Sequence, residues 1–229
     1  MFELPKIKLQ RIGHRGLADL APENTLLGLE AASKRGLGWV EFDVRTTKDS
    51  KWVLLHDASL KRTTAQSGWL SKKTWPEIQA QCPSIPSLEA VLKHCKQLGL
   101  YPNIEIKTPF VASLTHLRAL KQLCCLARKY CQPLPLISSF NLANTVFFAE
   151  KKPEFPLALL IHQDKSQALS LLAQYPRAFY SIHINYRLLN SKFLDQLRAY
   201  SPRVFLYNAP KNQYAAIIKQ YKTPLFVDH

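Results

Sequence analysis

The chain lacks any run of about 18 apolar residues, the length that a helix needs to cross a bilayer, so we expect no membrane-spanning segment. Its first residues, MFELPKIKLQR, hold no apolar core followed by small residues and do not resemble a secretory signal peptide. Both absences favour a cytoplasmic protein. At 229 residues the chain is long enough to bury a substantial core, and we predict one domain that spans residues 1–229.

Cysteine is sparse and poorly spaced for cross-linking or for metal binding. The cysteines are odd in number and form no C-x-x-C pair, which argues against a disulfide framework and against a zinc site. We expect the five thiols to be buried or incidental in a reducing compartment: Cys82, Cys95, Cys124, Cys125 and Cys131.

Acidic residues are also few. Sixteen Asp and Glu stand against 31 Lys and Arg, which gives a formal net charge of +15. Such a field attracts anionic small molecules, anionic membrane surfaces and nucleic acid without selecting among them. Basic and aromatic residues are too sparsely interleaved for a base-stacking platform, so we expect no specific nucleic-acid binding. Peripheral contact with an anionic membrane stays open, as does the oligomeric state.

The G-x-G-x-x-G turn of dinucleotide-binding folds is absent as well. The chain instead alternates short apolar strands with amphipathic helices. Eight strands are predicted, at residues 11–14, 39–44, 101–107, 134–139, 157–161, 180–184, 204–207 and 225–228. At this length the alternation favours an α/β fold, a compact (β/α)8 TIM barrel, over an open doubly wound sheet.

Two features interrupt the regular pattern. A further strand at 52–56 and an irregular stretch after it predict a small insertion near residues 57–87, which we place at the barrel mouth. The sequence ends one residue after the last predicted strand. We therefore expect a truncated C-terminal helix in place of the eighth outer helix of a full barrel.

Charged residues occur at alternate positions of two predicted strands. Glu41 and Asp43 of VEFDV point one way while their apolar neighbours point the other, and Glu105 and Lys107 repeat this pattern in NIEIK. Carboxylates inside a barrel are costly to bury unless a cation neutralises them. Three inward carboxylates suit Mg2+ or Ca2+, and Lys107 would balance an anion beside the metal. Taken alone, the pattern of Glu41 and Asp43 is also typical of an edge strand with one solvated face. The pattern of Glu105 and Lys107 is also typical of a surface ion pair.

Two histidines close predicted strands beside a charged residue: His14 next to Arg15, and His56 next to Asp57. With a divalent metal and the cations Arg15 and Lys107, they supply what phosphodiester cleavage needs. One imidazole takes a proton from the attacking oxygen and the other gives one to the leaving alcohol, while the cations hold the phosphate oxygens. We expect His94, His116, His162 and His229 to be packed or solvated residues, and a strand-end role for His183 stays open.

These motifs, in this order, resemble the glycerophosphodiester phosphodiesterase family in its compact cytosolic bacterial form. They are GHRG (13–16), APENT (21–25), EFDVRTTKD (41–49), LLHDASLKRTT (54–64) and NIEIK (103–107), continued by SSF (138–140) and SIHINYRLLN (181–190). Any one motif is weak, but the combination is specific and covers nearly the whole chain.

The resemblance implies a barrel whose mouth binds a glycerophosphodiester, a small-molecule substrate, and releases glycerol 3-phosphate and an alcohol. It implies a divalent metal, Mg2+ or Ca2+, as cofactor. Matched position by position, it makes His14 and His56 the catalytic acid–base pair and makes Arg15 and Lys107 phosphate contacts. The implied metal ligands are Glu41, Asp43 and Glu105.

Departures from the family pattern lie late in the chain. Asn208-Ala209-Pro210 stands where members commonly have a TVN-like stretch, and Val227-Asp228 replaces the usual TD. These changes leave the predicted site intact and bear on the substrate pocket and the released alcohol. Within APENT we expect Glu23 and Asn24 to hold the mouth loop or to begin the first helix, with Asn24 as its N-cap.

Two alternatives stay open. A phospholipase D-like enzyme on the same barrel would act on intact (lyso)phospholipids. A non-catalytic binder of anionic lipid or nucleic acid is a different class, and it predicts that some of the seven site residues are lost, whereas all seven are present. We therefore predict a phosphoric diester hydrolase and leave the metal, the alcohol and the first general base open.

Overall fold

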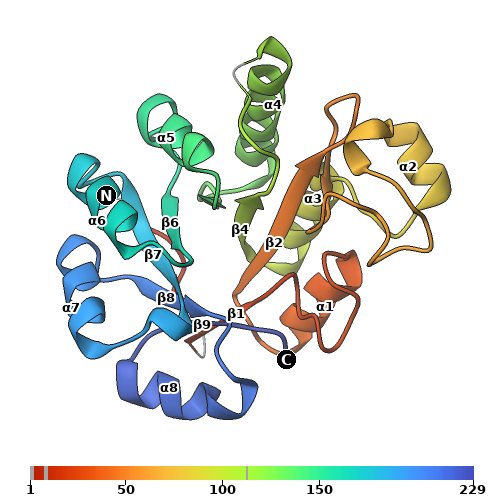
Figure 1. The fold of residues 1–229 in the computed structure, drawn as a ribbon. Helices are drawn as coiled ribbons and strands as arrows, with labels where there is room; N and C mark the ends of the chain where they lie inside the picture. The colour runs from red at the N-terminus through yellow and green to blue at the C-terminus, as the bar shows by residue number, and fades with distance from the viewer. Residues whose placement is uncertain (1–2, 8–9, 112) are drawn as a thin grey trace.

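A computed structural model describes residues 3–7, 10–111 and 113–229. Within these ranges eight parallel strands close into a barrel ringed by helices (Figure 1). The strands are β1 (Arg11–Gly13), β2 (Trp39–Thr46), β4 (Tyr101–Ile106), β5 (Leu136–Ser139), β6 (Leu157–Ile161), β7 (Phe179–Asn185), β8 (Val204–Tyr207) and β9 (Leu225–Val227). β1 pairs with both β9 and β2, which closes the ring. The predicted (β/α)8 TIM barrel is confirmed.

The outer ring consists of helices that follow successive barrel strands. They are α1 (Leu26–Lys34), α3 (Leu88–Leu98), α4 (Leu114–Tyr130), α5 (Leu142–Lys151), α6 (Lys165–Gln174), α7 (Ser191–Tyr200) and α8 (Tyr214–Tyr221). Polar side chains cap the first turns of all of these helices except α8, as Ser87 does by accepting from the N–H of Ala90 at the start of α3. Over the described residues no helix follows β9.

The predicted insertion is present between β2 and α3. β3 (Trp52–Leu54) pairs antiparallel with β2, and a 3-10 turn η2 (Leu70–Lys72) and helix α2 (Trp75–Gln81) follow. The insertion packs on a small core of its own, formed by Val53, Leu55, Leu60, Leu70, Ile78, Cys82 and Ile85. This core holds the insertion as an ordered part of the barrel mouth.

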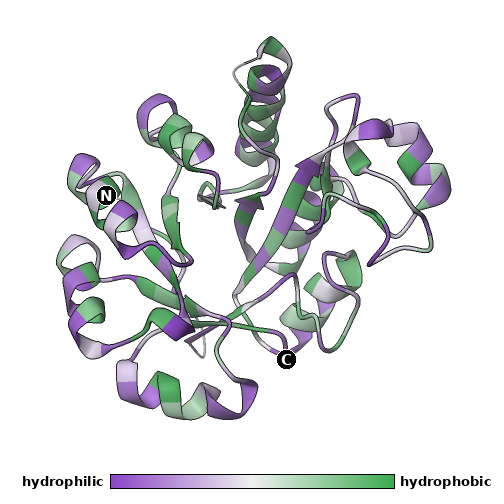
Figure 2. Ribbon diagram, viewed as in Figure 1, coloured by the Kyte–Doolittle hydropathy of each residue, from purple (hydrophilic) through white to green (hydrophobic). Residues whose placement is uncertain are grey.

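Strand alternation decides which side chains enter the barrel. Trp39 packs in the interior core, whereas Val40 and Phe42 pack outward against the helices. Glu41 and Asp43 share the parity of Trp39 and therefore point inward. Figure 2 shows the alternating hydrophilic and hydrophobic residues along β2.

The register between β2 and β4 brings acids from the two strands together. Asp43 pairs with Glu105, and Glu41 pairs with Asn103, one step nearer the bottom of the barrel. Each acid lies above an interior layer of large apolar side chains that includes Trp39. The interior is therefore apolar below and acidic at the mouth.

Cysteines and helix hydropathy give two further observations. All five cysteines are free thiols, four of them buried, and Cys125 is exposed. None of the helices described is both long enough and apolar enough to span a bilayer.

The turn after β1 packs backbone to backbone on α1. Gly16 has a φ of 90°, and a Cβ at this position would lie 2.7 Å from the carbonyl carbon of Gly28. Glycine is required here for the positive φ and for the close approach. The contact fixes the loop that carries His14 and Arg15 relative to the helix.

Gly16→Ala is expected to lower the free energy of unfolding by about 2–4 kcal/mol, because steric overlap adds to left-handed strain. Gly36→Ala is the matched control. Gly36 has a φ of 74° but open space at its Cβ position, so we expect a loss of only about 1–2 kcal/mol. Urea unfolding measures both variants, and equal losses would contradict the close approach of turn and helix.

Candidate active site

The barrel mouth holds a cavity of about 190 Å3 at the carboxyl ends of the strands. It is lined by His14, Arg15, Glu41, His56, Asn103, Glu105, Lys107, Phe140, Leu160, His162, His183, Tyr207, Asn208 and Phe226. Six of the seven residues predicted from the sequence lie on this wall. The seventh, Asp43, is buried behind it in contact with Arg15 and Lys107. The structure therefore brings the whole predicted set together.

Three buried carboxylates lie together beside the cavity: Glu41, Asp43 and Glu105. One oxygen from each lies within 4.8 Å of one oxygen from each of the others. Burial, together with the charge of Asp43, raises the pKa of Glu41 to about 8 and that of Glu105 to about 7. Glu41 Oε1 has no hydrogen-bond partner among the described residues. Buried, mutually repelling oxygens of this kind fit a hard divalent cation such as Mg2+ or Ca2+.

Two basic side chains balance part of this negative charge. Lys107 Nζ lies 2.5 Å from Glu105 Oε1 and 3.2 Å from Asp43 Oδ1, and Arg15 Nε lies 3.4 Å from Asp43 Oδ2. Burial raises the pKa of Asp43, but Lys107 and Arg15 outweigh that effect and lower it. Asp43 therefore stays ionised. Both basic groups also line the cavity, where they face any anion that enters.

The loop after β1 is bonded to the carboxylates. The backbone N–H of Arg15 donates to Glu41 Oε2 over 3.0 Å. The Asn24 amide donates to Asp43 Oδ2 over 2.9 Å and accepts from the Asp43 N–H over 3.0 Å. Asn24 has a φ of 57°, which turns its side chain toward β2, and Thr25 caps α1 instead. The prediction that Asn24 is the N-cap is therefore wrong.

An aspartate holds each of the two predicted catalytic imidazoles. His14 Nδ1 lies 2.8 Å from Asp228 Oδ1, and His56 Nδ1 lies 2.6 Å from Asp57 Oδ1. These contacts fix the orientation of both rings and engage Nδ1, so Nε2 is the nitrogen left for proton exchange. Asp228, which the sequence marks only as part of a departure from the family pattern, is thus a direct partner of His14.

The pKa values of the two imidazoles are displaced in opposite directions. Burial opposes protonation of His14, but the hydrogen bond to Asp228 and the charge of Glu41 outweigh it and raise its pKa. Burial lowers the pKa of His56, and the positive charge of Lys107 adds to that effect. Between the two values one ring is protonated and the other is neutral, which suits an acid and a base.

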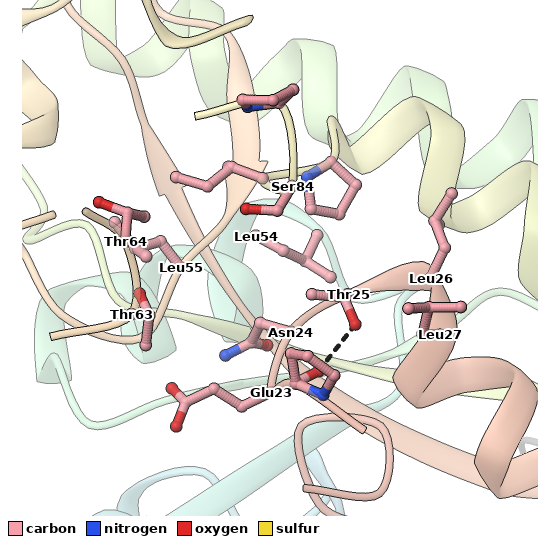
Figure 3. Close-up of a pocket in the computed structure, with 14 residues that line it drawn as sticks. Glu23, Asn24, Thr25, Leu26, Leu27, Leu54, Leu55, Thr63, Thr64 and Ser84 are labelled. Carbon is pink, nitrogen blue, oxygen red and sulfur yellow. Dashed lines mark hydrogen bonds between the residues drawn. The ribbon is translucent and has the colours of Figure 1, made fainter. Parts of the chain in front are cut away.

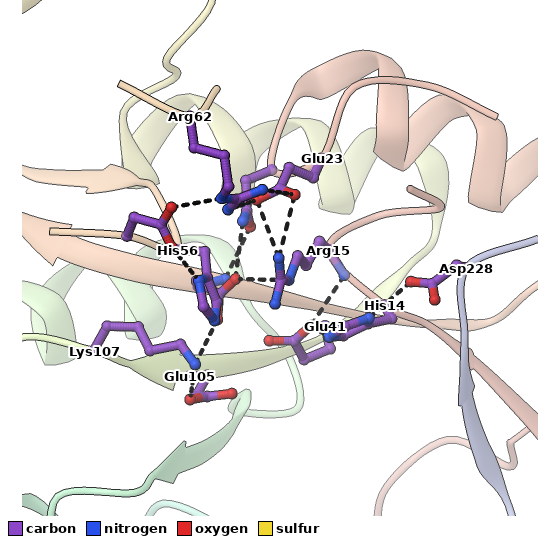
Figure 4. A network of polar contacts seen from close by, with 12 residues as sticks. His14, Arg15, Glu23, Glu41, His56, Arg62, Glu105, Lys107 and Asp228 are labelled. Carbon is purple, nitrogen blue, oxygen red and sulfur yellow. Dashed lines mark hydrogen bonds and ion pairs between the residues drawn. The ribbon is translucent and has the colours of Figure 1, made fainter. Parts of the chain in front are cut away.

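Arg62 of the insertion links both sides of the mouth (Figure 4). Its Nε lies 2.5 Å from Asp57 Oδ2, and its terminal nitrogens donate to the Glu23 carboxylate over 2.7 Å. Glu23 also accepts from Arg15 Nη1 over 3.2 Å. A chain of charge-assisted hydrogen bonds therefore runs from His56 to Arg15. Sequence reasoning assigned Arg62 no role, and its only signal was its place in the LKRTT segment.

Sequence reasoning also missed an aromatic wall of the cavity. Phe140 meets the rings of His162 and Tyr207 edge-on, with centroids 5.9 Å away in both pairs. The ring of His162 is nearly parallel to that of Tyr207. His162, expected to be packed or solvated, therefore belongs to the cavity.

His183 lines the same cavity inside the barrel. Its Nε2 lies 3.0 Å from Ser181 Oγ, and its Nδ1 has no hydrogen-bond partner in the described part of the chain. Burial lowers the pKa of His183 to about 3, so the ring is neutral at physiological pH. The alternation of polar residues at 181, 183 and 185 was the sequence signal that could have revealed this inward face.

A second and larger cavity, of about 550 Å3, lies between the loop after β1 and the insertion (Figure 3). Glu23 is the only ionisable residue among those that line it, and it is already paired with Arg15 and Arg62. None of the seven predicted site residues reaches this cavity. The smaller cavity is therefore the candidate active site.

Fold and site together define a TIM-barrel enzyme with a mouth built for an anionic substrate. Residues 14–229 match the sequence profile of the glycerophosphoryl diester phosphodiesterase family. Because the match spans nearly the whole chain, this protein belongs to that family and is a phosphodiester hydrolase.

Known relatives and structures agree with this assignment. A glycerophosphodiester phosphodiesterase of Bacillus subtilis is 26% identical over 225 residues, covering 84% of this chain and 74% of that protein. An Oleispira antarctica phosphodiesterase, solved in complex with the product sn-glycerol-3-phosphate, has a TM-score of 0.82 at 25% identity and covers 95% of this chain and 92% of its own. A Thermotoga maritima glycerophosphodiester phosphodiesterase shares the fold, with a TM-score of 0.77 at 23% identity and coverage of 97% and 95%.

Arg62→Met is expected to lower kcat/KM for phosphodiester hydrolysis by about 10–100-fold, because it frees Asp57 and Glu23 and loosens both His56 and Arg15. Arg128→Met is the matched control. The Arg128 side chain is 45% exposed against 47% for Arg62, and it pairs with Glu154 away from the cavity. Equal rates for both variants in steady-state assays would show that the linkage does not position the site.

Proposed function

We propose that this enzyme hydrolyses glycerophosphodiesters to glycerol 3-phosphate and an alcohol, with a divalent cation, Mg2+ or Ca2+, as cofactor. The observation that carries the proposal is the meeting of three buried carboxylates and two oriented imidazoles at one cavity. Family membership supports it, as does the glycerol 3-phosphate product bound to the Oleispira antarctica relative.

The cation would be held by Glu41, Asp43 and Glu105, whose buried oxygens fit its charge. When bound, it would polarise phosphate oxygens and neutralise charge that develops in the transition state. Arg15 and Lys107 line the cavity beside these acids and bind further phosphate oxygens. Because Asp43 contacts both basic side chains, it also fixes where they present their charge.

His14 and His56 transfer the protons of the reaction. With Nδ1 of each ring bound to an aspartate, Nε2 is the atom that exchanges a proton with substrate. One ring accepts the proton of the attacking oxygen, and the other protonates the leaving alcohol. Asp57 and Asp228 keep both rings in position and stabilise whichever one carries the charge.

The size of the cavity favours a small substrate. At about 190 Å3 it lies below the roughly 300–1,000 Å3 of pockets that enclose drug-sized ligands. This volume favours a glycerophosphodiester over an intact phospholipid as the group enclosed by the barrel. Residues 1–229 act in this proposal as one catalytic domain, and the cytoplasm is its proposed location.

His14→Ala and His56→Ala are each expected to lower kcat for glycerol 3-phosphate release from glycerophosphocholine or glycerophosphoethanolamine by about two to four orders of magnitude. The control is His94→Ala, because His94 lies on α3 and pairs with Glu30, outside the cavity. A coupled assay of glycerol 3-phosphate measures all three variants. Wild-type rates in both active-site variants would refute the acid–base assignment.

Removal of divalent cations with EDTA is expected to abolish hydrolysis, and Mg2+ or Ca2+ added back is expected to restore it, because the buried carboxylates need a counter-charge. Glu41→Gln should retain little activity at any cation concentration, whereas Glu77→Gln on α2 should behave as wild type. Running lysophosphatidylcholine beside the soluble diesters tests the phospholipase D alternative in the same assay. Full activity in EDTA would overturn the metal requirement.

A further inference from the structure

Exposed apolar side chains gather beside the barrel mouth. Of nine large hydrophobic residues exposed in the described structure, five follow β4 and β5: Val111, Leu114, Leu117, Phe140 and Leu142. We name these five residues the apolar rim. Leu114 is the most exposed of the nine, at 73%. Single apolar residues on a surface are ordinary, but a concentration of them marks an interaction site.

Two segments carry the apolar rim, the loop after β4 with the start of α4 and the loop after β5 with the start of α5, and they are bonded to each other. The N–H of Phe110 donates to Asn141 Oδ1 over 3.4 Å, and the side chain of Asn144 donates to the carbonyl of Thr108 over 2.9 Å. α4 and α5, which begin at these loops, are neighbours in the outer ring (Figure 1). The apolar rim is therefore one surface that spans the two loops and the first turns of α4 and α5.

This surface continues into the active-site cavity. Phe140 is 46% exposed and also lines the cavity, where Lys107 Nζ lies 5.4 Å from the centre of its ring. Whatever covers the apolar rim therefore lies next to the mouth through which substrate enters.

The segment of the chain that carries the apolar rim has basic residues and no acidic ones. The sequence has no Asp or Glu from residue 106 to residue 149. Within this range Arg118 and Lys121 are exposed on the first half of α4, on the side of the mouth. An apolar surface flanked by basic side chains matches an anionic bilayer, where apolar groups enter the headgroup boundary and basic groups meet lipid phosphates. The net charge of +15 adds long-range attraction to such a surface.

We propose that the apolar rim docks on an anionic lipid bilayer and holds the barrel mouth at the level of the headgroups. Docking would place the proposed hydrolysis at a membrane surface. Binding to the bilayer does not depend on that activity, since the lipid contacts and the catalytic acids are different groups. Vesicle binding is therefore measurable without turnover, and its failure is distinguishable from failure of the proposed activity.

Co-sedimentation with vesicles tests this docking on the full chain. Vesicles that mix phosphatidylglycerol with phosphatidylcholine are expected to bind the wild type about tenfold or more better than pure phosphatidylcholine vesicles. Leu114→Glu should lower binding to the anionic vesicles by about tenfold or more, because it removes apolar contact and adds a negative charge. Arg118→Glu should also weaken binding. Tyr200→Glu, at an exposed aromatic residue at the opposite end of the barrel, is the control and should bind as wild type.

Hydrolysis of soluble glycerophosphocholine by Leu114→Glu should equal that of the wild type, which shows that the variant is folded. Leu142→Ser provides a second, uncharged substitution in the apolar rim and should bind the vesicles less well than the wild type. Absence of wild-type binding to anionic vesicles, or unchanged binding by Leu114→Glu, overturns the proposal. So does a wild-type dimer that Leu114→Glu converts to a monomer in gel filtration, because the rim would then cover a second copy of this chain.

Discussion

The crowding of three carboxylates in a buried space governs the chemistry of this barrel. Glu41, Asp43 and Glu105 are placed by strand parity and by the register of β2 with β4, so the fold cannot separate them. Burying like charges within 4.8 Å of one another is unfavourable. This cost raises the pKa values of Glu41 and Glu105. Lys107 and Arg15 offset part of the repulsion, and a divalent cation would offset the rest.

The surrounding polar groups follow from that constraint. Arg15 must approach the acids closely, which sets the tight glycine turn after β1 and its packing on α1. Glu23 and Arg62 then fix Arg15 from outside the barrel and extend the network to Asp57 and His56 (Figure 4). The insertion therefore contributes to the site through Arg62 and Asp57, and His56 at its start lines the cavity itself.

Much of the site could be predicted from the sequence because strand parity is local information. Alternation within VEFDV and NIEIK was enough to set the acids inward, and eight regularly spaced strands were enough to indicate the barrel. Contacts between distant loops could not be predicted in this way. No local sequence pattern links Asp228 to His14, or Arg62 to Glu23. The N-cap prediction for Asn24 was wrong for a related reason. Asparagine suits a helix N-cap, but the positive φ of Asn24 directs its side chain into a hydrogen bond with Asp43.

Calorimetric titration of the metal-free protein with Ca2+ and with Mg2+ tests the central claim most directly. We predict one saturable site per chain for at least one ion, and a stabilisation of about 2.7 kcal/mol in thermal unfolding when that ion is at 100 times its Kd. Both effects should vanish when Glu41 and Glu105 are replaced together by glutamine. A folded, active wild type that shows neither heat of binding nor stabilisation with either ion would contradict the account.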